Sequence, residues 1–273
     1  MGVVAPKALV PAPEGSPRTF GLFSVVSPVE DSTLRWENGV EWEDAAAADV
    51  RAVGQWTDAG TVPGLPKQFD GALTRVESLA PLTVYSSVKC SAVGMPQEDA
   101  ERRATARLLV REEAAVERAL WTGDPSLGKG LVTVAKPLTG TLSMEEAVDA
   151  LEYYASRHGH RPVLHMSRRT ASALTRRKAL ESPGSTFLRL TTRLGSPVVA
   201  GVGYPDVSTI VATGPLVAYR GPVLTSSSRN GDLLDRAQNN QYAVAERQYV
   251  VGFAAAWSYK IDFQPVLPAV AGG

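Results

Sequence analysis

Residues 97–121 read QEDAERRATARLLVREEAAVERALW, and this stretch predicts one long helix on which the rest of the chain depends. It follows Pro96, contains no Gly or Pro, and stops at Thr122-Gly123. Its commonest residues, Ala, Arg, Glu and Leu, are strong helix formers. At 1.5 Å per residue the helix would be roughly 37 Å long. We therefore expect a long supporting helix and not a core helix of ordinary length.

The two faces of this predicted helix differ. Arg103, Arg107 and Arg111 repeat at i,i+4 on the polar face, where like charges repel by a few tenths of a kcal/mol per pair. Two interpretations stay open: a solvated face helped by Glu112 and Glu113, or a contact with acids of another segment or subunit. The apolar face repeats at helical spacing and consists of Ala104, Leu108, Leu109, Ala115, Val116, Ala119 and Leu120.

Composition excludes several classes of protein. The 273 residues carry 28 Lys+Arg and 28 Asp+Glu, so the net charge is zero, which argues against a protein that grips nucleic acid through bulk charge. Cys90 is the single cysteine, which excludes an intrachain disulfide. No apolar run approaches the roughly 20 residues that span a bilayer, so we expect no membrane partner.

Before the long helix, the sequence predicts extended structure. Residues 1–17 are rich in proline, which predicts an extended or disordered arm. An Asn38-Gly39 turn between Trp36 and Trp42 predicts a hairpin over 34–43, with the tryptophans as packing anchors. The other predictions are a short helix over 45–53, an exposed excursion over 54–70, strands over 72–77 and 82–93, and a strand or short helix over 20–29.

After the long helix, helices and strands alternate. Ser143 and Glu146 form a capping box that opens a helix to about Arg157. A second helix is predicted over 167–180, and its Arg168, Arg169, Arg176, Arg177 and Lys178 make it basic. That face is either solvated or in contact with nucleic acid or an acidic neighbouring subunit. Strands are predicted over 131–135, 162–166, 187–190, 197–202, 208–212, 215–220 and 240–251, the last continuing through 253–263, so the fold class is α+β.

No catalytic or cofactor motif is complete. Gly123 to Lys129 matches the GxxxxGK phosphate-binding pattern, but Gly130 stands where Ser or Thr is required, and the loop follows a helix instead of a strand. His158, His160 and His165 have no Cys, Asp or Glu close in sequence to complete a metal site. Cys90 lies in an apolar strand pattern, typical of an inert thiol. We therefore expect no cofactor, no metal and no enzyme.

Five stretches resemble one family in their order along residues 20–263. They are GVEW (39–42), VYSSVKCSAVG (84–94), EEAAVERALWTGD (112–124), LGSPVVAGVGYP (194–205) and YAVAERQYVVGF (242–253). In this order they are similar to major capsid proteins of tailed bacteriophages, especially phages of actinobacteria. That family has the Hong Kong 97-type fold, which encapsulins share.

The resemblance implies a division of the chain. Residues 1–29 would be the N-terminal arm, and residues 30–140 the first part of a peripheral domain. That part would include an extended E-loop over about 52–82 and the spine helix over 97–121. Residues 141–223 would form the axial domain, and residues 224–273 would return to the peripheral domain and end in a tail.

The resemblance also implies a function and partners. The chain would assemble into hexamers and pentamers of an icosahedral head in the host cytoplasm and remain in the virion. Its inner face would touch packaged double-stranded DNA weakly, and scaffolding, portal and decoration proteins are further partners. The expected intersubunit contact residues are Arg103, Arg107, Arg111, Lys67, Trp36 and Trp42, and in some members a loop Lys, here Lys67, joins an Asn such as Asn239 or Asn240 of a neighbour. An encapsulin shell and, more distantly, a nucleotide-using enzyme are the alternatives.

Overall fold

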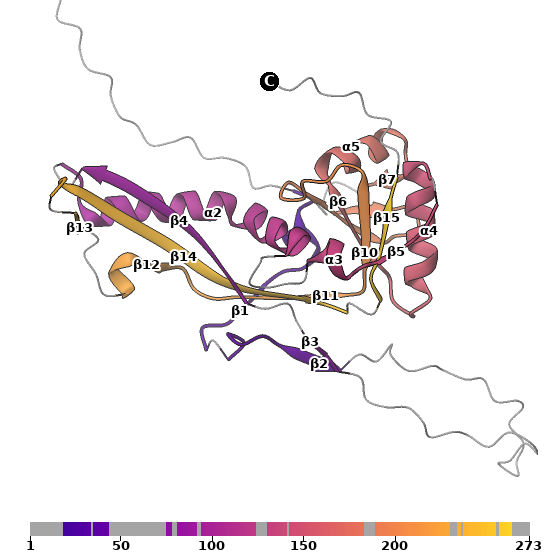
Figure 1. Ribbon diagram of the computed structural model, residues 1–273, viewed down its shortest axis with the longest axis horizontal. Coiled ribbons are helices and arrows are strands. Elements are labelled where there is room, and N and C mark those ends of the chain that lie inside the picture. Colours follow the sequence, from indigo (N-terminus) through magenta and orange to yellow (C-terminus); the bar gives the residue numbers. More distant parts are fainter. Residues whose placement is uncertain are drawn as a thin grey trace, which may run out of the picture.

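Two large β-sheets, one long helix that joins them, and a two-stranded sheet are the main elements of the computed structural model (Figure 1). It describes residues 19–33, 35–43, 75–77, 81–91, 94–123, 130–140, 142–182, 189–229, 234–235, 237–254 and 257–263. The predicted helix over 45–53, the excursion over 54–70 and Lys67 lie outside these residues.

The long helix α2 (Gln97–Thr122) confirms the central prediction. Pro96 precedes it, and Glu98 and Asp99 lie in its first turn. The positive end of the helix dipole stabilises their carboxylates there. Gly123 ends it at a positive φ of 71°, where its N–H donates to the Ala119 carbonyl. Its 26 residues make it about 39 Å long.

The first sheet is built along β14 (Asn240–Phe253). One edge of β14 pairs antiparallel with β4 (Leu82–Ser91) over residues 240–249. The other edge pairs in turn with β13 (Leu234–Asp235), β12 (Leu224–Thr225) and β11 (Leu216–Arg220), and β1 (Val29–Glu30) adds parallel to β11. The helix α2 lies along one face of this sheet (Figure 1). The core between them includes Ala100, Ala104, Leu108, Val84, Val88, Ala243 and Ala245.

The second sheet has the strand order β5-β15-β10-β6-β9-β8-β7. Both α4 (Met144–Ser156) and α5 (Arg168–Arg176) cover the same face, because Leu164, Met166 and Ile210 share their core. The alternate residues Val163, Val199 and Val211 face the core around α2. The strand bounds are Lys136–Pro137 (β5), Val163–Ser167 (β6), Leu180–Glu181 (β7), Leu190–Thr192 (β8), Pro197–Gly201 (β9), Thr209–Thr213 (β10) and Tyr259–Asp262 (β15).

The capping box at the start of α4 is confirmed. Ser143 Oγ accepts from the Glu146 N–H at 3.3 Å, and Glu146 accepts from the Ser143 N–H at 2.8 Å. Hydrogen bonding to the Ser143 backbone and hydroxyl lowers the pKa of Glu146. The second helix is confirmed but shorter than predicted, since it ends at Arg176 and Lys178 adopts a left-handed φ of 60° before β7.

Three predictions of local structure were wrong. The turn at Gly39 forms, but β2 (Glu41–Glu43) pairs with β3 (Arg75–Glu77) and not with residues before the turn. Residues Leu131–Val134 form a single helical turn, α3, which Thr133 caps by accepting from the Gly130 N–H, so the predicted strand is absent there. Strand β14 ends at Phe253 and is not continued, because residues 259–262 form a separate strand, β15, in the second sheet beside β10. For residues 20–29 the sequence left a strand or a short helix open, and the structure has a short helix, α1 (Leu22–Val25).

Adjacent leucines on α2 provide a test of its packing. Leu108 is 2% exposed, whereas Leu109 is 51% exposed. We expect Leu108→Ala to lower the free energy of unfolding of the unassembled subunit by about 2–5 kcal/mol, because it leaves a cavity in the core. Leu109→Ala, the control, should change it by less than about 0.5 kcal/mol. Urea titration followed by circular dichroism measures both, and equal effects would contradict the packing described here.

Candidate functional site

Carboxylates are buried on the core face of α2, a feature that the sequence analysis missed. Glu101, Glu112 and Glu117 are 9%, 7% and 1% exposed. Glu101 and Glu112 are eleven residues apart, a spacing that returns a helix to nearly the same face, and both share the stripe of Ala104 and Leu108. The eleven-residue spacing of Glu101 and Glu112 was therefore the signal in the sequence that could have predicted their burial. A buried carboxylate is costly unless it is hydrogen-bonded, so each of the three needs partners.

Glu117 and its neighbour Glu113 bind backbone amides of two distant segments. Glu117 Oε1 accepts from the Leu22 N–H at 3.0 Å, and Oε2 accepts from the Gly203 N–H at 2.8 Å. Glu113 Oε1 accepts from the Phe23 N–H at 2.9 Å. These amides belong to the start of α1 and to the loop after β9. The C-terminal half of α2 therefore fixes both segments against itself.

Glycines permit this close approach. A Cβ added at Gly203 would lie 2.2 Å from the Ala114 carbonyl oxygen of α2, and one added at Gly21 would lie 2.3 Å from Glu113 Oε1. Real Cβ contacts are never this short, so neither position accommodates a side chain without movement of the backbone or of Glu113.

Beside Glu117, an aromatic and polar chain connects α2 to the second sheet. Trp121 stacks on Tyr204 with ring centroids 4.7 Å apart. The Tyr204 hydroxyl lies 3.0 Å from His165 Nδ1, and His165 Nε2 lies 3.0 Å from Thr213 Oγ1. Because both ring nitrogens are hydrogen-bonded, His165 has no nitrogen to offer a metal. We call Glu113, Glu117, Trp121, Tyr204 and His165 the joint.

Burial shifts the pKa values of the joint residues. Desolvation raises the pKa of Glu117, and its backbone hydrogen bonds offset only part of this effect. Desolvation lowers the pKa of His165 to about 3 and raises that of Tyr204 well above its ordinary value, with Glu117 adding to the second shift. His165 and Tyr204 are therefore neutral across the physiological range, and burial favours the protonated form of Glu117.

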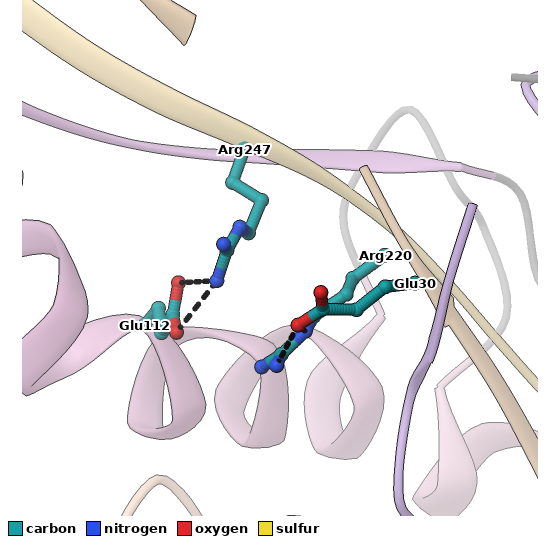
Figure 2. A network of polar contacts seen from close by, with 4 residues as sticks. All are labelled: Glu30, Glu112, Arg220 and Arg247. Carbon is teal, nitrogen blue, oxygen red and sulfur yellow. Dashed lines mark hydrogen bonds and ion pairs between the residues drawn. The ribbon is translucent and has the colours of Figure 1, made fainter. Parts of the chain in front are cut away.

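A second buried carboxylate forms an ion pair across the core of the first sheet (Figure 2). Glu112 accepts from Arg247 Nη1 of β14 at 3.2 and 3.3 Å, and their side chains are 9% and 13% exposed. Figure 2 shows Glu30 and Arg220 beside them, paired through Arg220 Nε at 3.0 Å. The pairing with Arg220 lowers the pKa of the exposed Glu30. The network connects α2, β14, β11 and β1.

The third carboxylate, Glu101, holds the segment after β12. It accepts from Ser226 Oγ at 3.0 Å and from the Ser227 N–H and hydroxyl at 2.9 and 2.8 Å. Burial opposes ionisation of Glu101, but these bonds and one from Gln97 outweigh it, so its pKa is lowered. Along its length, α2 thus holds the segment after β12, strand β14 and the loop after β9 through Glu101, Glu112 and Glu117.

The opposite face of α2 is open to solvent. Arg103, Arg107 and Arg111 are all exposed, and Leu109 and Val110 between them are 51% and 68% exposed. Arg103 lies 3.6 Å from the Met95 sulfur, and Arg107 donates to the Ser87 carbonyl at 3.3 Å. The structure therefore presents the three arginines on one surface, which we call the arginine ridge.

The other expected contact residues are in different surroundings. Trp36 is 3% exposed, stacks on Tyr219 at 6.2 Å and donates its indole N–H to the Asp31 carbonyl at 3.3 Å. Trp42 is half-buried, and a Cβ added at Gly252 would lie 2.8 Å from its ring. Asn239 adopts a left-handed φ of 54° just before β14 begins at Asn240. The structure does not bring Trp36 and Trp42 together with the arginine ridge.

The remaining motifs contain no assembled chemistry in the part of the chain that is described. Residues 124–129 of the GxxxxGK pattern lie outside it. Cys90 Sγ lies 3.7 Å from the Gln241 carbonyl, and His158 is hydrogen-bonded to Tyr259 Oη at 3.0 Å. Across the described ranges, no His, Cys, Asp and Glu side chains group as a metal site would require. Nor does any helix among them have the length and apolarity to cross a membrane.

Comparison with known proteins identifies the fold. No family model and no curated protein matches the sequence. Among solved structures, the capsid of an empty GTA particle matches with a TM-score of 0.61 at 15% identity, covering 96% of both chains. A chain from Mycobacterium phage Ogopogo matches with a TM-score of 0.56 at 13% identity, covering 95% of this chain and 97% of that one. One from Mycobacterium phage Adephagia gives 0.53 at 12% identity, with 94% and 96% covered. The fold is thus the Hong Kong 97-type fold of phage capsid chains.

The pKa of Glu117 gives a prediction about the joint. A raised pKa means that the folded state favours the protonated acid. Its stabilising contribution is therefore complete below the ordinary value of 4.5 and is lost as the pH rises through the raised value. In the Glu117→Gln variant the side chain cannot ionise. Its NH2 group takes the place of one carboxylate oxygen, so a donor faces a backbone N–H where the wild type has an acceptor. We expect it to lower the unfolding free energy by about 1–3 kcal/mol.

The difference in unfolding free energy between wild type and Glu117→Gln should be largest in acid and shrink with rising pH. Urea titrations of the unassembled subunit between pH 4 and 9 measure it. Glu98→Gln, on the exposed first turn of α2, is the control and should show little difference at any pH. A difference that grows with pH would contradict the raised pKa.

Proposed function

We propose that this chain is a major capsid protein that assembles into hexamers and pentamers of an icosahedral phage head enclosing double-stranded DNA. The observation that carries the proposal is the likeness to capsid structures over 96% of both chains. Its role is structural, and its place is in the virion after assembly in the host cytoplasm. Scaffolding, portal and decoration proteins are its further proposed partners.

Open surfaces of the subunit support assembly. In the described part of the chain, α2 covers one face of the first sheet, while the opposite face leaves Tyr85 of β4 69% exposed. The solvent face of α2 exposes Leu109 and Val110 as well. Large exposed apolar side chains on several faces favour coverage by neighbouring copies.

The domain division stays part of this proposal. The first sheet and α2 would form the peripheral domain, and the sheet with α4 and α5 the axial domain within residues 141–223. The strands β5 and β15 extend that second sheet beyond these bounds on both sides. Residues 1–29 would be the arm and residues 52–82 the E-loop.

Contact with packaged DNA would be weak. The chain has no net charge, so it lacks the excess of Lys and Arg that releases many counterions from DNA. A shell wall of this kind encloses the duplex without holding it tightly.

Electron microscopy of the expressed protein tests the proposal. We expect closed shells or rings of five and six subunits, either from the protein alone or when it is co-expressed with the products of neighbouring genes. Particles filled with DNA would support a phage head, and shells filled with a protein cargo would support the encapsulin alternative. Discrete monomers or dimers under every condition would contradict a shell protein.

The arginine ridge is the contact that we propose for a neighbouring subunit, with Lys67 and Trp42 as further contact residues and Trp36 acting by holding the turn at Gly39. Arg107→Ala should leave the unfolding free energy of the lone subunit within about 0.5 kcal/mol of wild type, because the side chain is exposed. It should lower the yield of shells in sedimentation. Arg102→Ala, which removes an exposed arginine paired with Asp99 in the first turns, is the control and should assemble normally. Equal yields for both variants would exclude the ridge as a contact.

A further inference from the structure

Three short segments meet at one edge of the second sheet. Strand β6 runs parallel to β9, and β8 and β7 continue the sheet antiparallel, so β6, β7 and β9 all begin at the same edge. The segments that precede these strands are residues 157–162, 177–179 and 193–196. The topology therefore brings together three loops that are distant in sequence.

Contacts of the third loop join it to the other two. Arg161 Nη1 lies 3.9 Å from the point where a Cβ would stand at Gly195, and Arg193 Nε donates to the Lys178 carbonyl at 2.9 Å. The three loops thus form one continuous surface.

Some basic residues near this edge are already engaged, and others are not. Arg168, Arg169, Arg177 and Arg193 each have a contact within the chain. Four further cationic side chains are exposed and make no hydrogen bond or ion pair with the described residues. They are Arg157, Arg161, Arg176 and Lys178, which we call the basic edge.

The ends of the helices explain only half of the basic edge. The negative end of a helix dipole attracts cations, which accounts for Arg157 and Arg176 at the ends of α4 and α5. Arg161 and Lys178 lie in the loops beyond these ends. Four like charges at one edge repel one another, and an anion from outside the subunit would offset that repulsion.

The length of the basic edge suits a nucleic-acid backbone. Arg161 and Lys178 precede strands that are three spacings apart in the sheet, which is about 14 Å. One strand of duplex DNA advances 3.4 Å per nucleotide, so this length spans about four phosphates. Four cations therefore face a row of about four regularly spaced negative charges.

A second copy of this chain offers no matching anion in its described residues. The exposed acids that have no partner there lie on separate elements, around β2, on α2 and on α4. They are Glu37, Glu43, Glu98 and Asp149. At most two of them lie on the same element, so they do not form a row that could pair with all four cations.

We propose that the basic edge binds the phosphate backbone of double-stranded nucleic acid. The inference rests on the proposed function, in which the shell encloses duplex DNA, and it assigns the contact to one surface of the subunit. Because the contact neutralises only about four phosphates and reads no bases, it is weak and independent of sequence. A chain with no net charge can make such a local contact.

An acidic protein segment is the competing occupant. Leu194 lies in the loop between Arg193 and Gly195 and is 79% exposed. A protein partner would bury this leucine together with the cations, whereas a phosphate backbone gains nothing from it. Leu194 therefore separates the two occupants.

The salt dependence of binding by the unassembled subunit tests the proposal. Fluorescence anisotropy with a duplex of about 20 bp, between about 50 and 200 mM salt, should give a log–log slope of about −3 to −4. Arg161→Ala and Lys178→Ala should each reduce the magnitude of this slope by about one and weaken binding about tenfold at 50 mM salt. Circular dichroism establishes that each variant is folded.

Other substitutions serve as the control and as the contradicting outcomes. Arg102→Ala removes an exposed arginine of α2 that pairs with Asp99, and it should bind the duplex as wild type does. An unchanged slope in both test variants would overturn the proposal, and a loss found only in Arg107→Ala would move the contact to the arginine ridge. A loss in Leu194→Ser as large as in Arg161→Ala would overturn it in favour of a protein partner. Tighter binding of a single strand of equal length would exclude the duplex as the ligand.

Shell formation by the Arg161→Ala/Lys178→Ala variant separates this inference from the proposed function. We expect its shells to form in wild-type yield, and a loss of assembly would assign the basic edge to a subunit contact instead. If shells form but the wild-type subunit does not bind the duplex, only the inference is wrong. If the wild type forms no ring or shell, the proposed function is wrong, and the duplex titrations still decide whether the basic edge binds phosphates.

Discussion

The carboxylate of Glu117 joins three parts of the chain that are distant in sequence. It lies on α2 and accepts from the Leu22 N–H before β1 and from the Gly203 N–H after β9. Because the group is almost completely buried, it is tolerated only while these amides are in place. The orientation of α2 toward the second sheet, and of α1 toward both, therefore depends on these backbone hydrogen bonds as well as on the apolar core that they share.

The arrangement gives α2 two different tasks along its length. Its first turns form a platform for β4 and β14, with Ala100, Ala104 and Leu108 in the core. Its last turns press Trp121 against Tyr204 at the second sheet. The polar partners Arg247 and Ser226 fix the register of the helix on the first sheet, because a shift of one turn would leave Glu112 and Glu101 buried without them. Apolar contacts alone would allow such a shift.

Local signals in the sequence predicted local structure well, and their failures have physical causes. The long helix and the capping box at Ser143 depend on neighbours in sequence, and both were correct. The turn at Gly39 was also predicted correctly. The strand that follows it pairs with residues 75–77, and nothing in the sequence of the turn specifies that partner. Residues 132–134 are β-branched and predicted a strand, whereas the cap by Thr133 favours one helical turn. The joint could not be predicted, because its residues meet only through tertiary packing.

The central strand of the first sheet has a consequence for the order of folding during synthesis. Residues 240–253 pair with β4, β11, β12 and β13, and they leave the ribosome after all four of these strands. Until then, β4 and the core face of α2 have no partner strand. The five strands from β6 to β10 lie within residues 163–213, so most of the second sheet can form first. A nascent chain therefore completes its first sheet only after residues 240–253 have been synthesised, and chains that lack these residues cannot form it.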